Sequence, residues 1–393
     1  MFLLKRFKFK KSINKIDEFI VDEDQLKLFC ELASSQKSIG LDIEGNGFYR
    51  YPERVCLIQV SINDRPFIID PLQFDDLTSL GEIFNNSKIT KIVHAGDYDI
   101  RSLSRDYNFT FNNVFDTSIA AAFLGSGRLG LDAVLKEHLN VEVSKDKRLQ
   151  RSDWTIRPLS AEAITYAAND VRYLVNAMET MSDKLNSLGR FQWVQEEFKR
   201  LSAVKYEAKD EEVAFLNVKG SRDIEGQNLA VLRKLYQFRE DEAISKDRPP
   251  FKVISDSILV AIARNPQGNF DDIKGIGWWG RPEPSSRLKK VIKQGLEAPP
   301  VTRPKKKDNE RQRLSNKQRE RANVRLRSLK VWRKGIGDEL KLDPSILWPT
   351  SSLNRLSRFP NDFEVEMENP EVRLWQQKEF GESLKIMIDK DSG

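Results

Sequence analysis

Two carboxylates near the end of an apolar segment are the first residues whose types and spacing could do chemistry. In SIGLDIEGNG, residues 38–47, apolar side chains alternate with Asp42 and Glu44. Successive side chains of a strand point to opposite faces, so both carboxylates share a face and lie about 6.5–7 Å apart along the strand. Like charges this close repel, partial burial raises the cost, and a bound cation would remove both penalties. Ordinary surface acids on a solvent-facing strand are the alternative that this stretch leaves open.

Two more acidic sites follow the first one. In KIVHAGDYDI, Asp97 and Asp99 stand at the start of a helix that directly follows a strand. Asp97 suits the N-cap, whose side chain accepts a backbone N–H, but spacing alone does not decide which of the two is functional. In AITYAANDVRYL, Tyr166 and Asp170 are four residues apart and share one face of a helix. A surface tyrosine beside an acid is the ordinary alternative there.

The elements that must position these groups alternate between strands and helices over residues 19–185. The sequence NDRP between two of the strands is a turn signal. Strands joined by a short turn and followed by strand–helix alternation predict a mixed sheet with helices packed on it, an α/β fold. The first expected strand begins at Phe19, and the others span Ile39–Glu44, Val55–Ile62, Phe67–Asp70 and Ile89–His94. The expected helices span Glu23–Ala33, Asp97–Tyr107, Thr117–Leu124, Leu131–Leu139 and Ala161–Leu185.

Only helices are expected after Phe198. The stretches NLAVLRKLYQFREDEAI, PPFKVISDSILVAIARNP and SSRLKKVIKQGL carry apolar residues at helical spacing. The stretch EAPPVTRPKKKDNE is rich in proline and lysine and looks like a linker. A second helical block starts near Gln312, and its apolar stripe predicts core packing through Leu326, Leu329, Trp332, Ile336 and Leu340.

The bulk composition excludes several classes of protein. A length of 393 residues is enough for two or three domains. With 39% hydrophobic and 32% charged residues and no apolar run near the about 20 residues that span a bilayer, we expect a soluble protein with no membrane partner. Cys30 and Cys56 are the only cysteines, which argues against a disulfide framework or cysteine zinc site and favours the cytoplasm. The start, MFLLKRFKFKKSINK, lacks the features of a secretory signal, and we expect a basic edge strand or arm.

Positive charge is concentrated in one segment. The chain has a net charge of +6, and residues 303–334 contain 14 Lys/Arg and 3 Asp/Glu, a local net of +11 that leaves −5 for the remainder. A mildly acidic protein with one strongly basic segment predicts a polyanionic partner. A solvated linker is the alternative, and the two interpretations are compatible.

Taken together, the acidic sites resemble a known family. An Asp-x-Glu at a strand end, an Asp at a helix start and a Tyr-x-x-x-Asp on a later helix follow one another as in the DEDDy-type 3′–5′ exonucleases, and the chain resembles the ribonuclease D family. The stretches VFDTSIAAAFLG, GLDAVLKEHLNVEVS, KRLQRSDWTIRPLS and YAANDVRYL also look like that family's nuclease domain, in the same order. The resemblance covers residues 19–185 and implies a ribonuclease H-like fold.

The resemblance also chooses between the two helix-start acids. The family's second acid stands five residues after the position of His94, which implies Asp99 and leaves Asp97 as an extra carboxylate, expected at the cap. His94 itself is expected to be a structural residue behind the ligands rather than a metal ligand. The catalytic residues that the resemblance implies are Asp42, Glu44, Asp99, Tyr166 and Asp170.

In the implied chemistry, two divalent ions, Mg²⁺ or Mn²⁺, assist hydrolysis of a phosphodiester. By resemblance Asp42 bridges both ions, Glu44 and Asp170 hold the ion that activates water, and Asp99 supports the other. Tyr166 would orient the attacking water, and the product would be a nucleoside 5′-monophosphate. Carboxylates are ligands that hard cations prefer, and a chain with two histidines and two cysteines fits zinc poorly.

Nucleic-acid contacts are expected in the family-like stretch before the last helix of the site. The candidates are Lys147, Gln150, Trp154 and Arg157. Lysine and arginine pair with phosphates and tryptophan stacks on bases. Packing is the favoured alternative for Trp154, and a structural ion pair is an equal alternative for Arg157.

The helical half resembles HRDC domains, the modules shared by ribonuclease D and RecQ-type helicases. LYQFREDEAISKDRPPFKVISDSILVAIARNP matches well, with Phe238 where the family often has Trp, and the last block looks like a divergent second copy. The expected domains are the exonuclease (1–205), a first HRDC domain (215–300), a basic linker (301–318) and a second HRDC-like domain (319–393).

The resemblance predicts a monomeric 3′–5′ exoribonuclease that acts on RNA with a free 3′ end, tRNA precursors above all. A DNA-directed exonuclease of the same superfamily and a non-catalytic nucleic-acid-binding scaffold are the alternatives. Because all the expected chemistry precedes Leu185, removing residues 210–393 should leave a folded nuclease.

Overall fold

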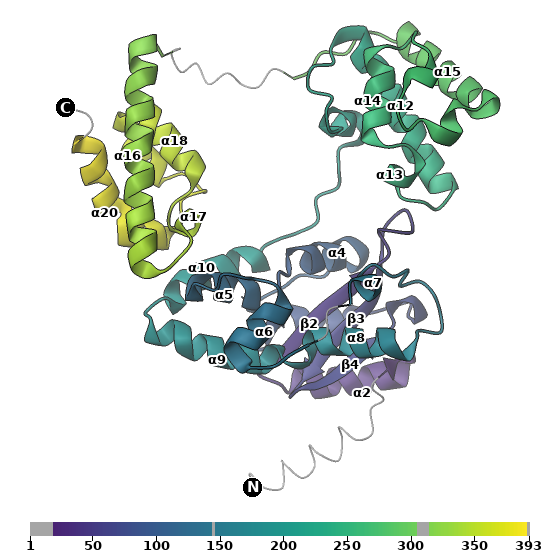
Figure 1. Ribbon diagram of the computed structural model, residues 1–393. Coiled ribbons are helices and arrows are strands. Elements are labelled where there is room, and N and C mark those ends of the chain that lie inside the picture. The colour runs from purple at the N-terminus through teal and green to yellow at the C-terminus, as the bar shows by residue number, and fades with distance from the viewer. Residues whose placement is uncertain (1–18, 144–145, 305–313, 391–393) are drawn as a thin grey trace.

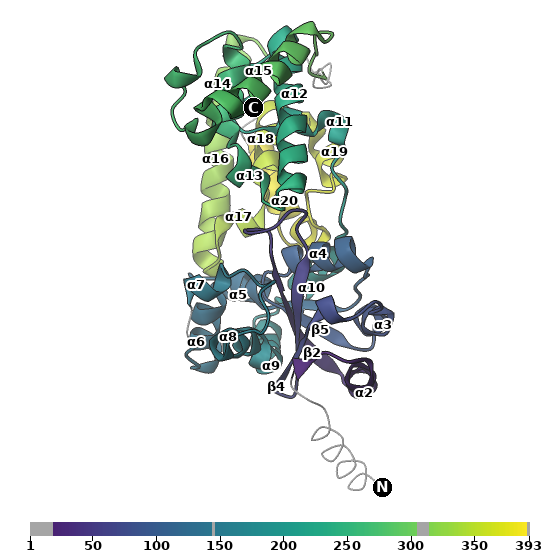
Figure 2. The same ribbon diagram turned by 90° about the vertical axis from the view of Figure 1, so that its right-hand side faces the viewer.

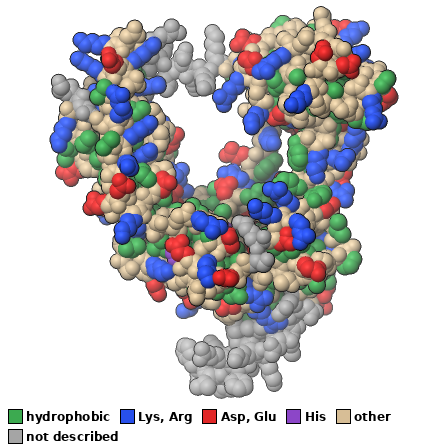
Figure 3. Space-filling view, in the orientation of Figure 1, with side chains coloured by type: hydrophobic (Ala, Val, Ile, Leu, Met, Phe, Trp, Pro, Cys, Tyr) green, Lys and Arg blue, Asp and Glu red, His purple; other side chains and the backbone are tan. Residues whose placement is uncertain are grey.

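The computed structural model of the chain forms three bodies (Figure 1) and describes residues 19–143, 146–304 and 314–390. We name them the α/β domain (19–202), the first helical domain (211–304) and the second helical domain (314–390). Both helical domains stand on the same side of the α/β domain (Figures 1 and 2), and Figure 3 shows an open hollow between the three bodies. The basic start of the chain, where an edge strand or arm was expected, lies outside the described residues.

A six-stranded mixed sheet forms the centre of the α/β domain. Its strand order is β1-β4-β3-β2-β5-β6, with β3 antiparallel to both β2 and β4 and the other neighbours parallel. The β3–β4 turn has φ of 47° at Asn63 and 64° at Asp64, the left-handed conformation that two-residue hairpins favour. The strands are β1 Phe19–Ile20, β2 Ser38–Gly45, β3 Val55–Ile62, β4 Arg65–Ile69, β5 Thr90–Val93 and β6 Val114–Asp116.

Helices cover both faces of this sheet. Leu41 and its neighbours on one face pack into a core with α2, α3 and α4, while α8 and α9 lie on the other face. The expected single helix 161–185 is two helices that meet at Tyr173, and α3, α7 and β6 were not expected. The helices are α2 Glu23–Ser34, α3 Thr78–Asn85, α4 Asp97–Tyr107, α5 Thr117–Leu124, α6 Leu131–Leu139, α7 Lys147–Gln150, α8 Ala161–Arg172, α9 Leu174–Ser187 and α10 Phe191–Ser202.

Gly40 lets α8 approach the sheet closely. A Cβ at this position would lie 3.0 Å from the carbonyl oxygen of Val171 and would also collide with the Ser61 hydroxyl. The Ser61 hydroxyl donates a hydrogen bond of 2.7 Å to that same carbonyl oxygen. Because Gly40 shares its strand face with Asp42 and Glu44, this contact places α8 over both carboxylates.

The first helical domain has its own apolar core, centred on α12. Its last described segment is bound to it, because Arg303 donates hydrogen bonds to the carbonyl oxygens of Ile224, Leu216 and Ser221. The helices are α11 Glu211–Ala214, α12 Gly226–Ser245, α13 Pro250–Val253, α14 Asp256–Arg264 and α15 Pro282–Glu297.

The second helical domain shares an apolar core with the α/β domain. The Trp375 ring stacks on Trp193 with centroids 5.0 Å apart and meets Phe123 edge-on at 5.4 Å. Arg190 of the α/β domain donates to the carbonyl oxygen of Leu340 at 2.6 Å. The helices are α16 Asn316–Leu340, α17 Pro344–Leu347, α18 Thr350–Arg358, α19 Phe363–Met367 and α20 Leu374–Lys390.

This shared core weighs against the expectation that removing residues 210–393 leaves a folded nuclease, since it makes real the risk of an exposed apolar surface. Truncation at 210 would expose Phe123, Trp193 and the rest of a continuous apolar surface. Exposed apolar area of this kind favours aggregation. The second helical domain is therefore part of the folding unit of the α/β domain.

We predict that Trp375→Ala lowers the free energy of unfolding by about 3–5 kcal/mol, the range for truncating a buried tryptophan. Trp375 is 6% exposed and contacts the α/β domain, so both bodies lose packing. Thermal unfolding followed by circular dichroism measures the change. Leu374→Ala, at a neighbouring position that is 71% exposed, is the control and should change little. An equal effect of both variants would refute the shared core.

The basic segment 303–334 is only partly available to a partner. Arg303 is bound internally, Arg325 is buried and donates to the carbonyl oxygen of Ser357, and Arg333 donates to that of Trp348. Residues 305–313, half of the expected basic linker, lie outside the described residues, and α16 already begins at Asn316. The cations exposed on α16 are Lys317, Arg319, Arg321, Arg327, Lys330 and Lys334. Within the described residues, no helix is long and apolar enough to cross a bilayer.

Candidate active site

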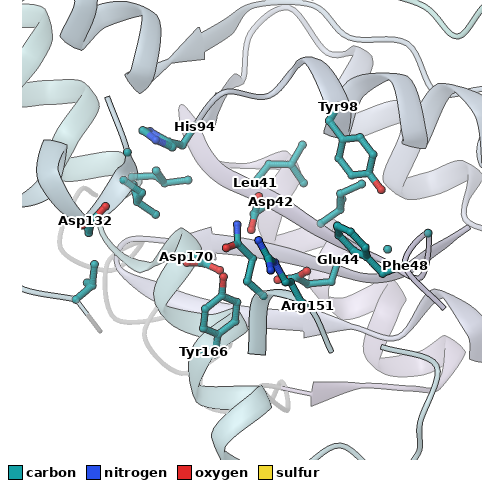
Figure 4. Close-up of a pocket in the computed structure, with 18 of the residues that line it drawn as sticks. Leu41, Asp42, Glu44, Phe48, His94, Tyr98, Asp132, Arg151, Tyr166 and Asp170 are labelled. Carbon is teal, nitrogen blue, oxygen red and sulfur yellow. The ribbon is translucent and has the colours of Figure 1, made fainter. Parts of the chain in front are cut away.

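Three carboxylates from two elements meet where β2 ends. Asp42 and Glu44 project from β2 toward α8, which carries Asp170 (Figure 4). One oxygen of each can be chosen so that all three lie within 4.8 Å of one another. All three side chains are half-buried. The strand alternation and the helix face predicted from the sequence therefore lead to one cluster.

The turn between β5 and α4 holds the fourth acid, Asp99, beside this cluster. Ala95 has a φ of 57° in that turn. Asp116, at the end of β6, accepts the backbone N–H of Ala95 at 3.1 Å and that of Gly96 at 2.9 Å. These hydrogen bonds fix the start of α4, so that Asp99 in its first turn is only 6% exposed. Asp116 thus acts as a positioning residue that sequence reasoning missed, although it lies in the family-like stretch VFDTSIAAAFLG.

Asp97 does not cap the helix, contrary to expectation. The N-cap is Gly96, which makes no side-chain cap, and Asp97 is the first helical residue. Its carboxylate is exposed and pairs with Arg101 one turn later, at 2.7 Å from Nε. The exposed Asp97 carboxylate is therefore engaged by Arg101, whereas Asp99 is buried beside the cluster.

Burial and mutual repulsion disfavour complete ionisation of the carboxyl groups in the cluster. The pKa of Asp42 lies well above its ordinary value because of burial and the charges of Asp99, Asp170 and Glu44. Burial and the charges of Asp170 and Asp99 raise the pKa of Glu44 in the same way. The pKa of Asp99 is raised to about 8 by burial and by Asp116, Asp170 and Asp97.

This electrostatic strain is of the kind that a bound cation relieves. A divalent ion among the carboxylates would favour their charged forms and cancel the repulsion. All the donors are oxygens, the ligands of Mg²⁺ and Mn²⁺ rather than of zinc or copper. The residues present therefore fit hard divalent cations, with Asp42, Glu44 and Asp170 as the closest set.

Tyr166 stands one turn before Asp170 and hydrogen-bonds to it. Burial and the negative charges of Asp170, Glu44 and Asp42 raise its pKa above the ordinary value, so the phenol stays protonated at neutral pH. The protonated hydroxyl can donate a hydrogen bond but cannot serve as a base.

Trp154 supports Tyr166 instead of meeting nucleic acid. It is 1% exposed, and its ring lies 6.1 Å from the Tyr166 ring, centroid to centroid. A side chain this deeply buried cannot stack on a base. The expectation of a nucleic-acid contact at Trp154 was therefore wrong, and the packing alternative is correct.

Arg157 forms the structural ion pair that was its equal alternative. Its Nε and Nη2 donate to Asp70 at 2.6 and 2.8 Å, and Nη2 also donates to the carbonyl oxygen of Cys56 at 3.0 Å. Nη1 donates to the carbonyl oxygens of Trp154 and Ile156. With its nitrogens engaged in this way, Arg157 anchors the segment before α8 to the sheet, which corrects its placement among the nucleic-acid contacts.

A cavity of about 700 Å³ opens above the carboxylates. Gln150, one of the expected nucleic-acid contacts, lines it, whereas Lys147 is exposed on α7 outside this lining. Arg151, next in sequence to Gln150, also lines the cavity and was missed. Other lining residues that sequence reasoning missed are Phe48, Tyr98, Asp132 and Phe251.

His94 lines the same cavity on the side of β5 (Figure 4). Its Nδ1 lies 2.9 Å from the Thr117 hydroxyl, which itself donates to the carbonyl oxygen of Val93 at 3.0 Å. Because that hydroxyl hydrogen is used, Nδ1 of His94 must donate to Thr117. This hydrogen bond fixes the orientation of the His94 ring, which is consistent with the structural role expected for His94 behind the metal-ligating carboxylates.

Comparisons with known proteins show which families the chain resembles. Residues 18–186 match the 3′–5′ exonuclease domain family, and residues 228–280 match the HRDC domain family. Ribonuclease D of Desulfotalea psychrophila is 32% identical over 252 residues, which cover 63% of this chain and 67% of the relative. Ribonuclease D of Bartonella henselae is 26% identical over 381 residues, 95% of this chain and 91% of the relative.

A solved structure shows the same fold. The crystal structure of Escherichia coli RNase D matches with a TM-score of 0.69 at 22% identity, covering 95% of this chain and 98% of that one. The likeness extends over the α/β domain and the helical region together. The mixed α/β fold followed by helical domains, predicted from the sequence, is thereby confirmed.

Proposed function

The chain belongs to the ribonuclease D family and is a 3′–5′ exoribonuclease. From this premise we propose that it trims structured RNA, tRNA precursors among them. The products would be nucleoside 5′-monophosphates, released by a two-metal-ion mechanism. The observation that carries the proposal is the meeting of Asp42, Glu44 and Asp170 within 4.8 Å, with Asp99 and Tyr166 beside them. We also propose that the enzyme acts as a monomer.

Each carboxylate has a separate task in this proposal. Asp42, whose pKa is raised by each of the other three acids, is central and would contact both ions. Glu44 and Asp170 would complete one ion site with it, and Asp99 the other. When bound, two divalent ions would lower the pKa of the attacking water and neutralise charge on the phosphate.

Tyr166 would position the attacking water. Its hydroxyl gives its one hydrogen to Asp170, so its oxygen can still accept a hydrogen bond from the water and leave a lone pair of that water directed at the phosphorus. Trp154 and the ion pair of Arg157 with Asp70 hold the start of α8 and so keep this hydroxyl in place.

The substrate class rests on the relatives. The E. coli RNase D whose fold matches is described as an exoribonuclease involved in structured RNA processing. We assign residues 215–300 to the first HRDC domain and 319–393 to a second, divergent one, as the domains that receive the body of such an RNA. The exposed cations of α16 support this assignment because they can pair with phosphates.

The decisive experiment compares products from matched RNA and DNA oligonucleotides with a free 3′ end. We predict stepwise release of nucleoside 5′-monophosphates from RNA in Mg²⁺ or Mn²⁺ and loss of release on chelation, read by chromatography of the products. An RNA blocked at its 3′ end by a phosphate is the matched control and should resist. Faster degradation of the DNA, or release of nucleoside 3′-monophosphates, would refute the proposal.

A further inference from the structure

The cavity above the carboxylates has an aromatic rim. Phe48 of the β2–β3 loop is 54% exposed, Tyr98 of α4 is 47% exposed and Phe251 of α13 is 56% exposed. All three line the same cavity as Asp42 and Glu44. Phe251 is the lining residue contributed by the first helical domain, so this domain reaches into the site itself.

Two of these rings have nothing to stack on. Among the residues that the structure describes, neither Phe48 nor Phe251 takes part in a contact with another ring or with a cation. Large apolar side chains left half-exposed inside a concave site mark a place where a ligand binds. The ligand of an exonuclease cavity carries planar bases, which stack on aromatic rings without regard to sequence.

Contacts between the β2–β3 loop and the first helical domain hold the aromatic rim in place. Lys252, next to Phe251, lies over the Tyr49 ring at 4.4 Å from its centroid. Tyr51 donates through its hydroxyl to Glu240 at 2.5 Å and through its backbone N–H to Asp247 at 3.1 Å. Figures 1 and 2 both show the β2–β3 loop rising from the sheet toward α13. The loop that carries Phe48 is thus bound to the domain that carries Phe251.

Arg50 strengthens this junction. It donates to Asp247 of the first helical domain at 3.0 Å and lies 3.5 Å from Asp153 of the α/β domain. The base of the same loop is closed by Asn46, whose side-chain oxygen accepts the backbone N–H of Arg54 at 2.8 Å. These contacts reduce the conformational freedom that binding would otherwise have to remove.

We propose that Phe48 and Phe251 form an aromatic clamp that stacks on bases next to the scissile phosphate, so that the first helical domain supplies a specificity-determining residue to the active site. The clamp rests on the proposed function. It selects an unpaired 3′ end, because a base can enter between the rings only when it has left its helix. Arg151, exposed on the same cavity wall, would pair with a phosphate of that strand.

The test compares kcat/KM on a single-stranded RNA for wild type and Phe251→Ala. Loss of one stacked base is worth about 1–3 kcal/mol, so we expect a loss of about five- to 150-fold, chiefly through KM. Phe251→Tyr keeps the ring and should restore most of the activity. Ile244→Ala, at a position of the same domain that is 57% exposed and outside the cavity, is the matched control.

An abasic scan identifies the cause of the loss. RNAs that lack one base at successive positions from the 3′ end are degraded by wild type and by Phe251→Ala. At the stacked position, the ratio of wild-type to variant kcat/KM should shrink toward one, because base and ring are removed from the same interaction. A ratio that stays constant across the scan, or no loss in Phe251→Ala, overturns the clamp alone. Failure of the wild type to release mononucleotides in Mg²⁺ or Mn²⁺ overturns the exonuclease assignment as well.

Discussion

Replacing Asp42 by asparagine should abolish metal-dependent cleavage, with a fall in kcat of about a thousandfold or more. The charges of all three other acids raise the pKa of Asp42, so Asp42 is the acid placed to contact both ions. Metal stabilisation of the transition state is worth several kcal/mol, and each 1.36 kcal/mol is tenfold in rate. Single-turnover cleavage of a 3′-labelled RNA measures the loss.

The same variant should be more stable than wild type when metal is removed by a chelator. The raised pKa of Asp42 means that the folded protein binds its proton more tightly than the unfolded chain does. Wild-type stability therefore falls as pH rises above the unfolded value of about 3.9, and asparagine removes part of that fall. At pH 7 we expect a midpoint increase of about 2–4 °C for each kcal/mol regained.

Two outcomes would contradict this prediction. Folded Asp42→Asn that retains near-wild-type cleavage would show that the site is elsewhere. A lower thermal midpoint in chelator would show that the cluster is not under electrostatic strain. Asp75→Asn, an exposed acid far from the cavity lining in sequence, is the control and should alter neither property.

Asp99→Asn should cost at least about a hundredfold in kcat, whereas Asp97→Asn should stay within about threefold of wild type. Asp99 is 6% exposed beside the cluster, and Asp97 is exposed and pairs with Arg101. An exposed i, i+4 pair contributes about 0.3–0.5 kcal/mol, so its loss is mild.

The pair of variants separates catalysis from helix stability. Both substitutions place the same neutral amide in the first turn of α4, so any effect of the amide itself on the helix is shared. In a Mn²⁺ titration, Asp99→Asn should bind the metal more weakly and therefore need a higher Mn²⁺ concentration than wild type for cleavage. Equal losses in the two variants, or a larger loss in Asp97→Asn, would overturn the assignment of Asp99.

Local patterns in the sequence were sufficient to predict the fold class and the side chains that face one another. The alternation in β2 places Asp42 and Glu44 on one face, and the spacing of Tyr166 and Asp170 places both on one face of α8. Such periodicities follow from backbone geometry alone, which is why they can be read without a structure. The resemblance to ribonuclease D then selected Asp99, and the structure brings Asp99 beside the cluster.

Only the tertiary structure decided what packs against each face. Trp154 and Arg157 carry the right chemistry for nucleic acid, yet one is buried behind Tyr166 and the other is bound to Asp70. Phe251 reaches the cavity from a domain about 80 residues beyond Asp170 in the chain, and Trp375 joins the core of the α/β domain from farther still. Local periodicity tells which side of an element is apolar or charged, but the partner of that side is chosen by contacts between residues distant in sequence.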